Sequence, residues 1–181
     1  MTEIVERTVL FADLRGSTAM YETLGNSDAT AVVTQSIALL AQIVSLHDGR
    51  VIKTLGDGLM AMFVAPADAV VAADEMHESL ERIGGPGATA TRGRLVPLKL
   101  QVGLAHGEVI EMSGDVFGDA VNVAARLIDH AGDNETLVTS TVLDALVEVE
   151  QARFRSLDRM QLRGRVEPVH VYLMGSMRRF G

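Results

Sequence analysis

The chain has 181 residues, of which 48% are hydrophobic and 22% charged, and its formal net charge is -8. This length suits one globular domain with a sizeable core and is short for two. The negative charge argues against general nucleic-acid binding, and the absence of cysteine excludes disulfides and thiolate chemistry. The N-terminus lacks a signal-sequence pattern and no apolar run approaches membrane-spanning length, so we expect a cytoplasmic protein or a soluble piece of a larger one.

A buried strand and two helices are predicted near the N-terminus. Residues 8–12 are apolar and β-branched at their start, which is typical of a buried strand. Residues 16–18, a glycine followed by two hydroxyl residues, predict a turn that opens a helix. Ser27 or Asp28 is expected to cap a longer helix, and Gly49 is expected to stop it.

The next segment predicts a hairpin and another helix. Two apolar stretches, 51–53 and 59–64, flank Gly-Asp-Gly at 56–58, which is a hairpin turn signal. Pro66 is expected to open a helix with one apolar face. Residues 84–97 are rich in Gly, Thr and Ala and predict a loop.

The C-terminal half continues with strands around one helix. Residues 98–104 alternate apolar with polar or small residues and predict a half-buried strand, and 107–110 are expected to turn back as its partner. A helix is predicted from about Asp119 to His130. Further strands are predicted at 136–138, near Phe154 and at 169–172. The β-α-β-β-α-β order with additions predicts an α+β sandwich of helices on one sheet.

Two aspartates are candidates for a metal site. Asp13 ends a predicted strand and Asp57 lies at a glycine-flanked hairpin tip. If those strands are neighbours the two carboxylates converge, and paired carboxylates suit hard cations such as magnesium or manganese. Either aspartate alone is more simply a turn residue, and the same holds for Asp115. Lys53, in an otherwise apolar strand, is by default an edge-strand residue reaching for solvent.

Two further patterns are suggestive only in combination. Asn122 and Arg126 are four residues apart on one predicted helix, hence on one face, where a polar pair is most often solvated. The turn at residues 16–18 could direct backbone amides at an anion, although Ser and Thr are also ordinary helix caps.

Three separated blocks resemble the signatures of class III adenylate and guanylate cyclases. They are Phe-Ala-Asp-Leu-Arg-Gly-Ser-Thr at 11–18, Lys-Thr-Leu-Gly-Asp at 53–57, and Gly-Asp-Ala-Val-Asn-Val-Ala-Ala-Arg-Leu at 118–127. Their order and spacing match the family along about residues 7–146, and residues 162–169 resemble its closing strands. The resemblance implies one catalytic domain over 1–181, with a ferredoxin-like βαββαβ core, helices on a mainly antiparallel sheet, and closing strands at about 150–174.

The resemblance also implies roles for individual residues. Asp13, Asp57 and the backbone carbonyl of Leu14 match the ligands of two divalent cations, Mg²⁺ or Mn²⁺. The turn of Gly16, Ser17 and Thr18 matches the one that holds the triphosphate. Lys53 and Asp115 match the purine-selecting pair, and Asn122 and Arg126 match the pair that acts in the transition state. Arg165, or alternatively Arg163, matches a cation at the terminal phosphates.

The activity implied is an adenylate cyclase that converts ATP to 3′,5′-cyclic AMP and pyrophosphate in signal transduction. A lysine donates and a carboxylate accepts, which complements N1 and N6 of adenine, whereas a guanylate cyclase would be expected to carry an acid in place of Lys53. In this family each active site is shared, so a homodimer would build two sites and a monomer would be inactive. The segment 108–114 is shorter than the dimerisation arm of many relatives, and a regulatory domain in a longer protein is compatible with the abrupt C-terminus.

Three alternatives differ from this reading. A catalytically silent cyclase-like module would bind nucleotide or a partner, but such modules usually lack a metal aspartate, the arginine or the purine pair, all of which are present. A guanylate cyclase is disfavoured by Lys53 and Asp115. A palm-type nucleotidyl transferase would share the two-aspartate logic, and the Asn122 and Arg126 block disfavours it.

Overall fold

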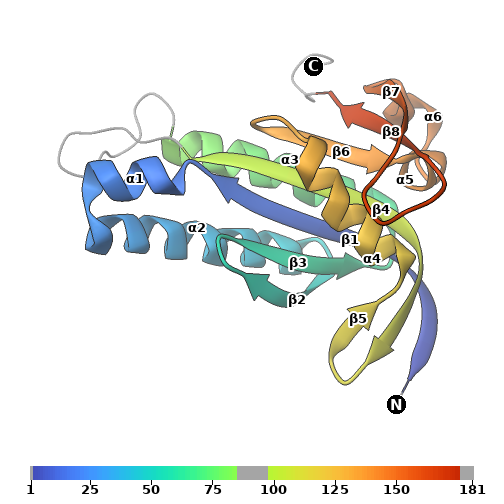
Figure 1. The fold of residues 1–181 in the computed structure, drawn as a ribbon, viewed down its shortest axis with the longest axis horizontal. Helices are drawn as coiled ribbons and strands as arrows, with labels where there is room; N and C mark the ends of the chain where they lie inside the picture. Colours follow the sequence, from blue (N-terminus) through green and yellow to red (C-terminus); the bar gives the residue numbers. More distant parts are fainter. Residues whose placement is uncertain (1, 85–97, 176–181) are drawn as a thin grey trace.

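The computed structural model describes residues 2–84 and 98–175, and Figure 1 shows their arrangement. The predicted loop at 84–97 lies almost wholly outside the described residues. The elements in chain order are β1 (Glu3–Arg15), α1 (Ser17–Leu24), α2 (Asn26–Leu46), β2 (Gly49–Leu55), β3 (Gly58–Phe63), α3 (Pro66–Gly84), β4 (Lys99–Met112), β5 (Asp115–Phe117), α4 (Asp119–Leu127), the 3-10 turn η1 (Ile128–His130), β6 (Glu135–Thr139), α5 (Ser140–Asp144), α6 (Glu148–Gln151), β7 (Phe154–Met160) and β8 (Val169–Met174).

The described strands form one sheet in the order β2-β3-β1-β4-β6-β8-β7, with β5 paired to β4 outside this path. Strands β4 and β6 run parallel and the other pairs are antiparallel. From β1 to β4 the chain follows the predicted βαββαβ order, and β7 and β8 close the sheet beyond β6. The α+β class and the mainly antiparallel sheet are therefore confirmed.

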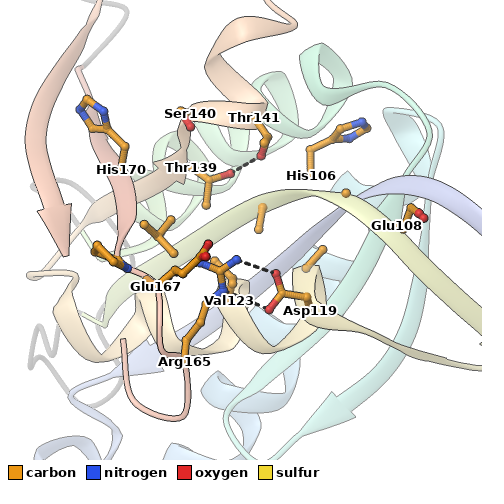
Figure 2. A pocket seen from close by; sticks show the side chains of 15 residues that line it. His106, Glu108, Asp119, Val123, Thr139, Ser140, Thr141, Arg165, Glu167 and His170 are labelled. Atoms are coloured by element: carbon orange, nitrogen blue, oxygen red, sulfur yellow. Dashed lines mark hydrogen bonds and ion pairs between the residues drawn. The ribbon is translucent and has the colours of Figure 1, made fainter. Parts of the chain in front are cut away.

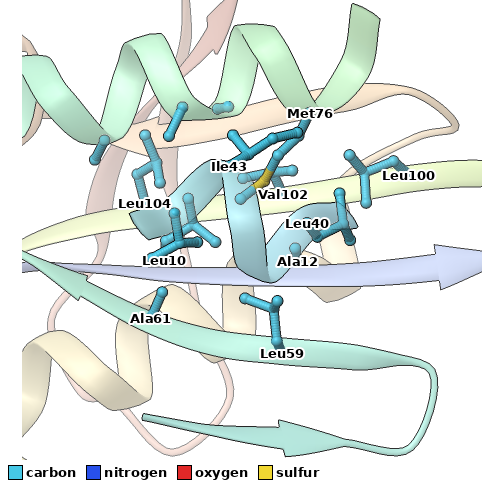
Figure 3. Packing of buried hydrophobic residues seen from close by; sticks show 14 of the residues in the cluster. Leu10, Ala12, Leu40, Ile43, Leu59, Ala61, Met76, Leu100, Val102 and Leu104 are labelled. Carbon is cyan, nitrogen blue, oxygen red and sulfur yellow. The ribbon is translucent and has the colours of Figure 1, made fainter. Parts of the chain in front are cut away.

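The larger core lies between one face of the sheet and helices α1, α2 and α3, and we call this the helical face. Strand β1 contributes alternate residues such as Leu10 and Ala12, because successive side chains of a strand point to opposite faces. Helix α2 supplies Leu40 and helix α3 supplies Met76, and all four side chains are almost fully buried (Figure 3). This packing fixes β1 in the middle of the sheet, where it carries the first candidate aspartate at its end.

The opposite side of the sheet carries a smaller core under α4, and we call it the α4 face. It includes Val9 of β1 and Met60 of β3, which pack with Ala124 and Leu127 of α4. Helix α4 approaches β4 closely at Gly103, where a Cβ would lie 2.6 Å from the carbonyl oxygen of Ala124. Only glycine permits this contact, so the position of α4 on the sheet is set by the sequence of β4.

The prediction that no apolar run approaches membrane-spanning length does not hold for helix α2. It has 21 residues and a mean hydropathy of 1.7, so by length and composition alone it could cross one. One side of it, including Val33, Leu40 and Ile43, is buried in the core under the helical face. A core helix meets the same criteria. The prediction missed it because Thr, Gln and Ser interrupt the apolar residues, so no uninterrupted run is visible.

Strand β4 differs from its prediction in two ways. It does not turn back at 107–110 but continues to Met112, because this stretch pairs with the first residues of β1, Ile4 opposite Ile110. The chain turns at Ser113 and Gly114 instead, both with positive φ. The strand is also buried on both faces over 100–104, rather than half-buried as predicted, since α3 covers one face and α4 the other.

The helix ends differ from the prediction as well. Gly25 precedes the first residue of α2, so neither Ser27 nor Asp28 caps it. Helix α2 ends before Asp48, which takes the positive φ expected of Gly49. Gly49 begins β2, where a Cβ would come within 2.4 Å of the Phe63 ring. The short helices α5 and α6 were not predicted, since four or five residues carry too little periodicity to be recognised.

Candidate active site

The two candidate metal aspartates lie at one end of the neighbouring strands β1 and β3. Asp13 pairs with Gly58 in the antiparallel register, which places Asp57 beside it. The amide of Leu14 donates to the backbone oxygen of Asp57 at 2.8 Å and ties the hairpin tip to β1. A Cβ on Gly58 would lie 2.3 Å from the carbonyl oxygen of Ala12, so glycine is required for this approach. The predicted convergence of the two aspartates is confirmed.

The charges around Asp13 oppose one another. Burial raises the pKa of its carboxyl above the ordinary value, the Arg15 guanidinium lowers it, and the neighbouring Asp57 raises it further. One carboxylate oxygen of Asp13 lies 3.1 Å from Nη2 of Arg15. Two adjacent carboxylates and a backbone carbonyl are the oxygen donors that a hard divalent cation prefers, so these residues fit such an ion. Among residues 2–84 and 98–175, no cluster holds three or more His, Cys, Asp or Glu side chains in metal-binding arrangement.

The predicted anion-binding turn lies directly beside these carboxylates. Gly16 takes a positive φ of 93° and precedes the first residue of α1, as the sequence predicted. Ser17 does not cap the helix; its hydroxyl donates to Oδ2 of Asp57 at 2.6 Å. Because no side chain caps α1, the amides of its first turn keep their partial positive charge for another acceptor.

Lys53 and Asp115, which the family resemblance paired, lie in direct contact. They are 62 positions apart, and Nζ of Lys53 donates to Oδ2 of Asp115 at 3.1 Å. The other carboxylate oxygen of Asp115 accepts the amide of Val116 at 2.7 Å. This backbone hydrogen bond, followed by the one from Lys53, lowers the pKa of Asp115 below its ordinary value. Both side chains are partly exposed, so a ligand can reach them.

The position of this pair depends on two irregular features of the sheet. Strand β2 is an edge strand, as expected for a lysine, and its register shifts between Val51 and Lys53. Strand β5 folds back on β4 through the turn at Ser113 and Gly114 and brings Asp115 towards β2. The contact between Lys53 and Asp115 therefore joins two segments on the α4 side of the sheet.

Helix α4 carries the last two candidate residues. It buries Val123 and Leu127 against the sheet and leaves Asn122 exposed. Arg126 is half-buried, with Nη1 lying 3.9 Å from the carboxylate of Asp129. A hollow of about 160 Å³ is lined by Asp13, Leu55 and Gly58 from the strands and by Ala125 and Ile128 from the helix segment. Within the described residues of one chain, no hydrogen bond or ion pair joins Asn122 or Arg126 to the two metal aspartates.

Arg165 lies in a separate cleft of about 480 Å³. Its guanidinium contacts both carboxylate oxygens of Asp119 at 3.2 Å (Figure 2). It also donates to the carbonyl oxygen of Glu167 at 3.1 Å. The cleft is bounded by the start of α4, the end of β6 and the segment before β8. Its lining includes neither the candidate metal ligands Asp13 and Asp57 nor the candidate purine pair Lys53 and Asp115. The phosphate-binding role of Arg165 thus stays a prediction, and Arg163 is exposed in the same segment.

Sequence reasoning missed Arg15 and Gln101. Arg15 stands two residues after Asp13 on a strand, so the two-residue period would have placed both on one face. Gln101 is opposite Asp13 in the register of β1 with β4, and it accepts a hydrogen bond from Nε of Arg15 at 2.7 Å. Nothing local marks Gln101, because its partner lies 86 positions away.

Residues 1–175 match the family described as adenylate and guanylate cyclase catalytic domain. The chain belongs to this family. It is 32% identical over 152 residues to an adenylate cyclase of Streptomyces coelicolor, covering 83% of this chain and 37% of that protein. It is also 32% identical over 136 residues to an uncharacterized protein of Mycobacterium tuberculosis, covering 75% and 33%. This cyclase domain thus spans about a third of the length of these relatives.

Solved structures share the fold of this cyclase domain. The adenylyl cyclase CyaB from P. aeruginosa superposes with a TM-score of 0.82 at 23% identity, covering 99% of this chain and 98% of that one. The guanylyl cyclase Cya2 gives a TM-score of 0.78 at 23% identity, covering 96% and 93%. Both structures are 23% identical to this chain, so the likeness shows the shared fold, while membership of the cyclase family rests on the family match. Both substrate types occur among these structures, so the fold leaves the choice of nucleotide open.

Proposed function

We propose that this domain is an adenylate cyclase, forming 3′,5′-cyclic AMP and pyrophosphate from ATP. In this reaction the ribose 3′-oxygen bonds to the α-phosphorus, the bond to pyrophosphate breaks, and the 3′-hydroxyl proton passes to solvent. The observation that carries the choice of ATP is the pairing of Lys53 with Asp115 at 3.1 Å. A lysine ammonium has three donors and a carboxylate several acceptor sites, so each can also bind a base edge.

The donor and the acceptor of this pair match the hydrogen-bonding groups on the edge of adenine. Lys53 can donate to N1 of adenine, and Asp115, held ionised by its backbone hydrogen bond, can accept from N6. Guanine presents an acceptor at O6 and a donor at N1, so the order of donor and acceptor along its edge is reversed. A lysine held at the adenine N1 position would face a hydrogen-bond donor on guanine, which leaves both groups unpaired.

Asp13, Asp57 and the carbonyl of Leu14 would hold two divalent cations, Mg²⁺ or Mn²⁺, beside the first turn of α1. When bound, such ions acidify a hydroxyl nucleophile and neutralise phosphate charge. The chain's own contributions are positional. Ser17 orients the carboxylate of Asp57 through a 2.6 Å hydrogen bond, and the uncapped amides of α1 would donate to the triphosphate oxygens. Arg126 would neutralise charge on the phosphoryl oxygens, and Asn122 would orient the ribose.

A homodimer would unite groups that one chain keeps apart. Asn122 and Arg126 make no hydrogen bond or ion pair with Asp13 or Asp57 within the described residues. In the proposed dimer the metal aspartates of one chain would work with Asn122, Arg126 and the Lys53–Asp115 pair of the other copy. An apolar row supports such an association. Ile4, Ile110 and Phe117 follow one another across β1, β4 and β5, and 68%, 37% and 46% of their surfaces are exposed.

The test is cyclic nucleotide formation with Mn²⁺ or Mg²⁺ over a range of protein concentrations. We expect cyclic AMP, with a specific activity that rises with protein concentration because only the assembled fraction works. Asp57→Ala should abolish it. Absence of product from ATP and from GTP at high protein concentration with Mn²⁺ would contradict the proposal and favour a silent nucleotide-binding module.

A further inference from the structure

The Arg15 side chain occupies a fixed position beside the candidate metal aspartates. Nη2 lies 3.1 Å from Oδ2 of Asp13, and Nε donates to Oε1 of Gln101 at 2.7 Å. Both contacts lie on the α4 face, because Asp13 and Gln101 are direct cross-strand partners in β1 and β4. About half of the Arg15 side chain, 48%, is exposed, so the guanidinium borders solvent on the side where a ligand would enter.

Gln101 holds Arg15 in one orientation. Only 9% of Gln101 is exposed, and its Nε2 donates to the carbonyl oxygen of Ala131 at 2.6 Å. A carbonyl can only accept, so the amide nitrogen must face Ala131 and the amide oxygen must face Arg15, which can only donate. The end of the η1 turn thus fixes the amide, and the amide fixes the guanidinium.

This arrangement places a cation on Asp13 when no metal is bound. Two adjacent carboxylates repel each other, and the Arg15 guanidinium offsets part of that repulsion. A divalent ion that approaches alone meets this positive charge and must compete with it for the same carboxylate. A divalent ion that arrives bound to a triphosphate is repelled less by Arg15. The phosphate oxygens of the triphosphate can accept hydrogen bonds from the guanidinium in place of Asp13.

We propose that Arg15, oriented by Gln101, is an internal counter-ion that weakens binding of a free divalent cation at Asp13 and favours binding of the cation together with its nucleotide. The inference rests on the proposed metal site and names a residue that controls it. Arg15 acts directly on the carboxylate, and Gln101 is a positioning residue.

The test is direct Mn²⁺ binding, followed by electron paramagnetic resonance of the free ion, with and without a non-cyclisable ATP analogue. Arg15→Gln should tighten binding of free Mn²⁺ about two- to fivefold, in the range of a partly exposed ion pair. The gain should shrink at high ionic strength, which a merely structural effect would not do. Binding of Mn²⁺ with the analogue should be unchanged or weaker, since the phosphates lose an arginine.

Two further variants separate the causes. Arg155→Gln removes the same charge from an exposed position on β7, the far edge strand, and should leave Mn²⁺ affinity unchanged. Gln101→Met keeps every charge but frees Arg15, and should give part of the gain. Unchanged or weaker binding of free Mn²⁺ in folded Arg15→Gln would overturn the inference alone. If the unaltered protein bound no Mn²⁺ even with the analogue, the proposed metal site would fail and the inference with it.

Discussion

The helical face and the α4 face of the same sheet differ in how completely their side chains are covered. Under α2 and α3 the strands contribute apolar residues such as Leu10, Val102 and Leu104, none of them measurably exposed. On the α4 face the apolar core is smaller, and charged groups such as Asp13 and Lys53 border it. One strand, β1, thus supplies stability through one set of alternate residues and a candidate metal ligand through the other.

The largest expected effect on stability comes from creating a cavity in the core of the helical face. Leu40 of α2 is fully buried among apolar side chains, so Leu40→Ala should lower the free energy of unfolding by about 2–5 kcal/mol through lost burial and the cavity left behind. Urea unfolding measures this. The activity per folded molecule should stay near that of the unaltered protein. Loss of activity in the folded variant would show that stability and activity cannot be assigned to separate faces of the sheet.

The second substitution changes a candidate site residue on the α4 side and leaves the core of the helical face intact. Asp57→Asn keeps an acceptor for the Ser17 hydroxyl but removes a candidate metal-binding charge. We expect cyclase activity to fall about a hundred- to a thousandfold, the usual scale for losing one preorganised electrostatic contact. The urea midpoint should be unchanged or higher, because repulsion with Asp13 is relieved. Retained activity would remove Asp57 from the site.

A largely buried histidine on α3, His77, makes the stability of the helical face depend on pH. His77 donates to or accepts from Thr136 at 2.7 Å, and its Nδ1 has no hydrogen-bond partner within the described residues. Burial lowers its pKa from 6.5 to about 4, although Asp74 and Glu81 act in the opposite direction. Below pH 6.5 this histidine is therefore protonated in the unfolded chain, whereas in the folded chain it is not protonated until about pH 4. The free energy of unfolding should fall by about 3 kcal/mol as pH drops through this window.

Urea unfolding at several pH values checks the histidine. His77→Gln keeps a polar nitrogen for Thr136 but does not titrate, so its stability should vary less over the same range. If both proteins lost stability in parallel between pH 6.5 and pH 4, another group would be responsible.

The smallest expected change concerns the choice of nucleotide. Lys53→Ala removes the donor to adenine N1, and we expect the ratio of kcat/KM for ATP over GTP to fall about tenfold, equivalent to one hydrogen bond to a charged group. Arg50→Ala provides the matched control, because Arg50 lies on the same strand and pairs with Glu111 instead. A ratio altered equally by both substitutions would point to net charge rather than to base recognition.

The sequence predicted the parts of the fold that short-range patterns encode. The hairpin around Asp57 and the helix carrying Asn122 and Arg126 follow from local turn signals and periodicity, and the structure contains both. The course of β4 did not follow, since Gly107 looks like a turn residue and continues the strand only because β1 pairs with it. A Cβ at Gly107 would lie 3.6 Å from that of Ala120, an ordinary van der Waals distance, so packing does not require glycine there.

The same division holds for the candidate site. Family motifs identified Asp13 and Asp57, but the partner of each depends on contacts between distant segments. Arg15 of β1 donates a hydrogen bond to Gln101 of the neighbouring strand β4, and Ser17 donates one to Asp57, 40 positions away in the sequence. Register and tertiary packing decide such contacts, and neither can be derived from one sequence without the sheet order.

The most direct test of the central claim is product formation by the unaltered protein from an equimolar mixture of ATP and GTP with Mn²⁺, both cyclic products being quantified in the same reaction. We expect cyclic AMP in clear excess, because the Lys53–Asp115 pair on the α4 face is proposed to complement adenine. Cyclic GMP in excess, or no cyclic product at a protein concentration that supports dimers, would contradict it.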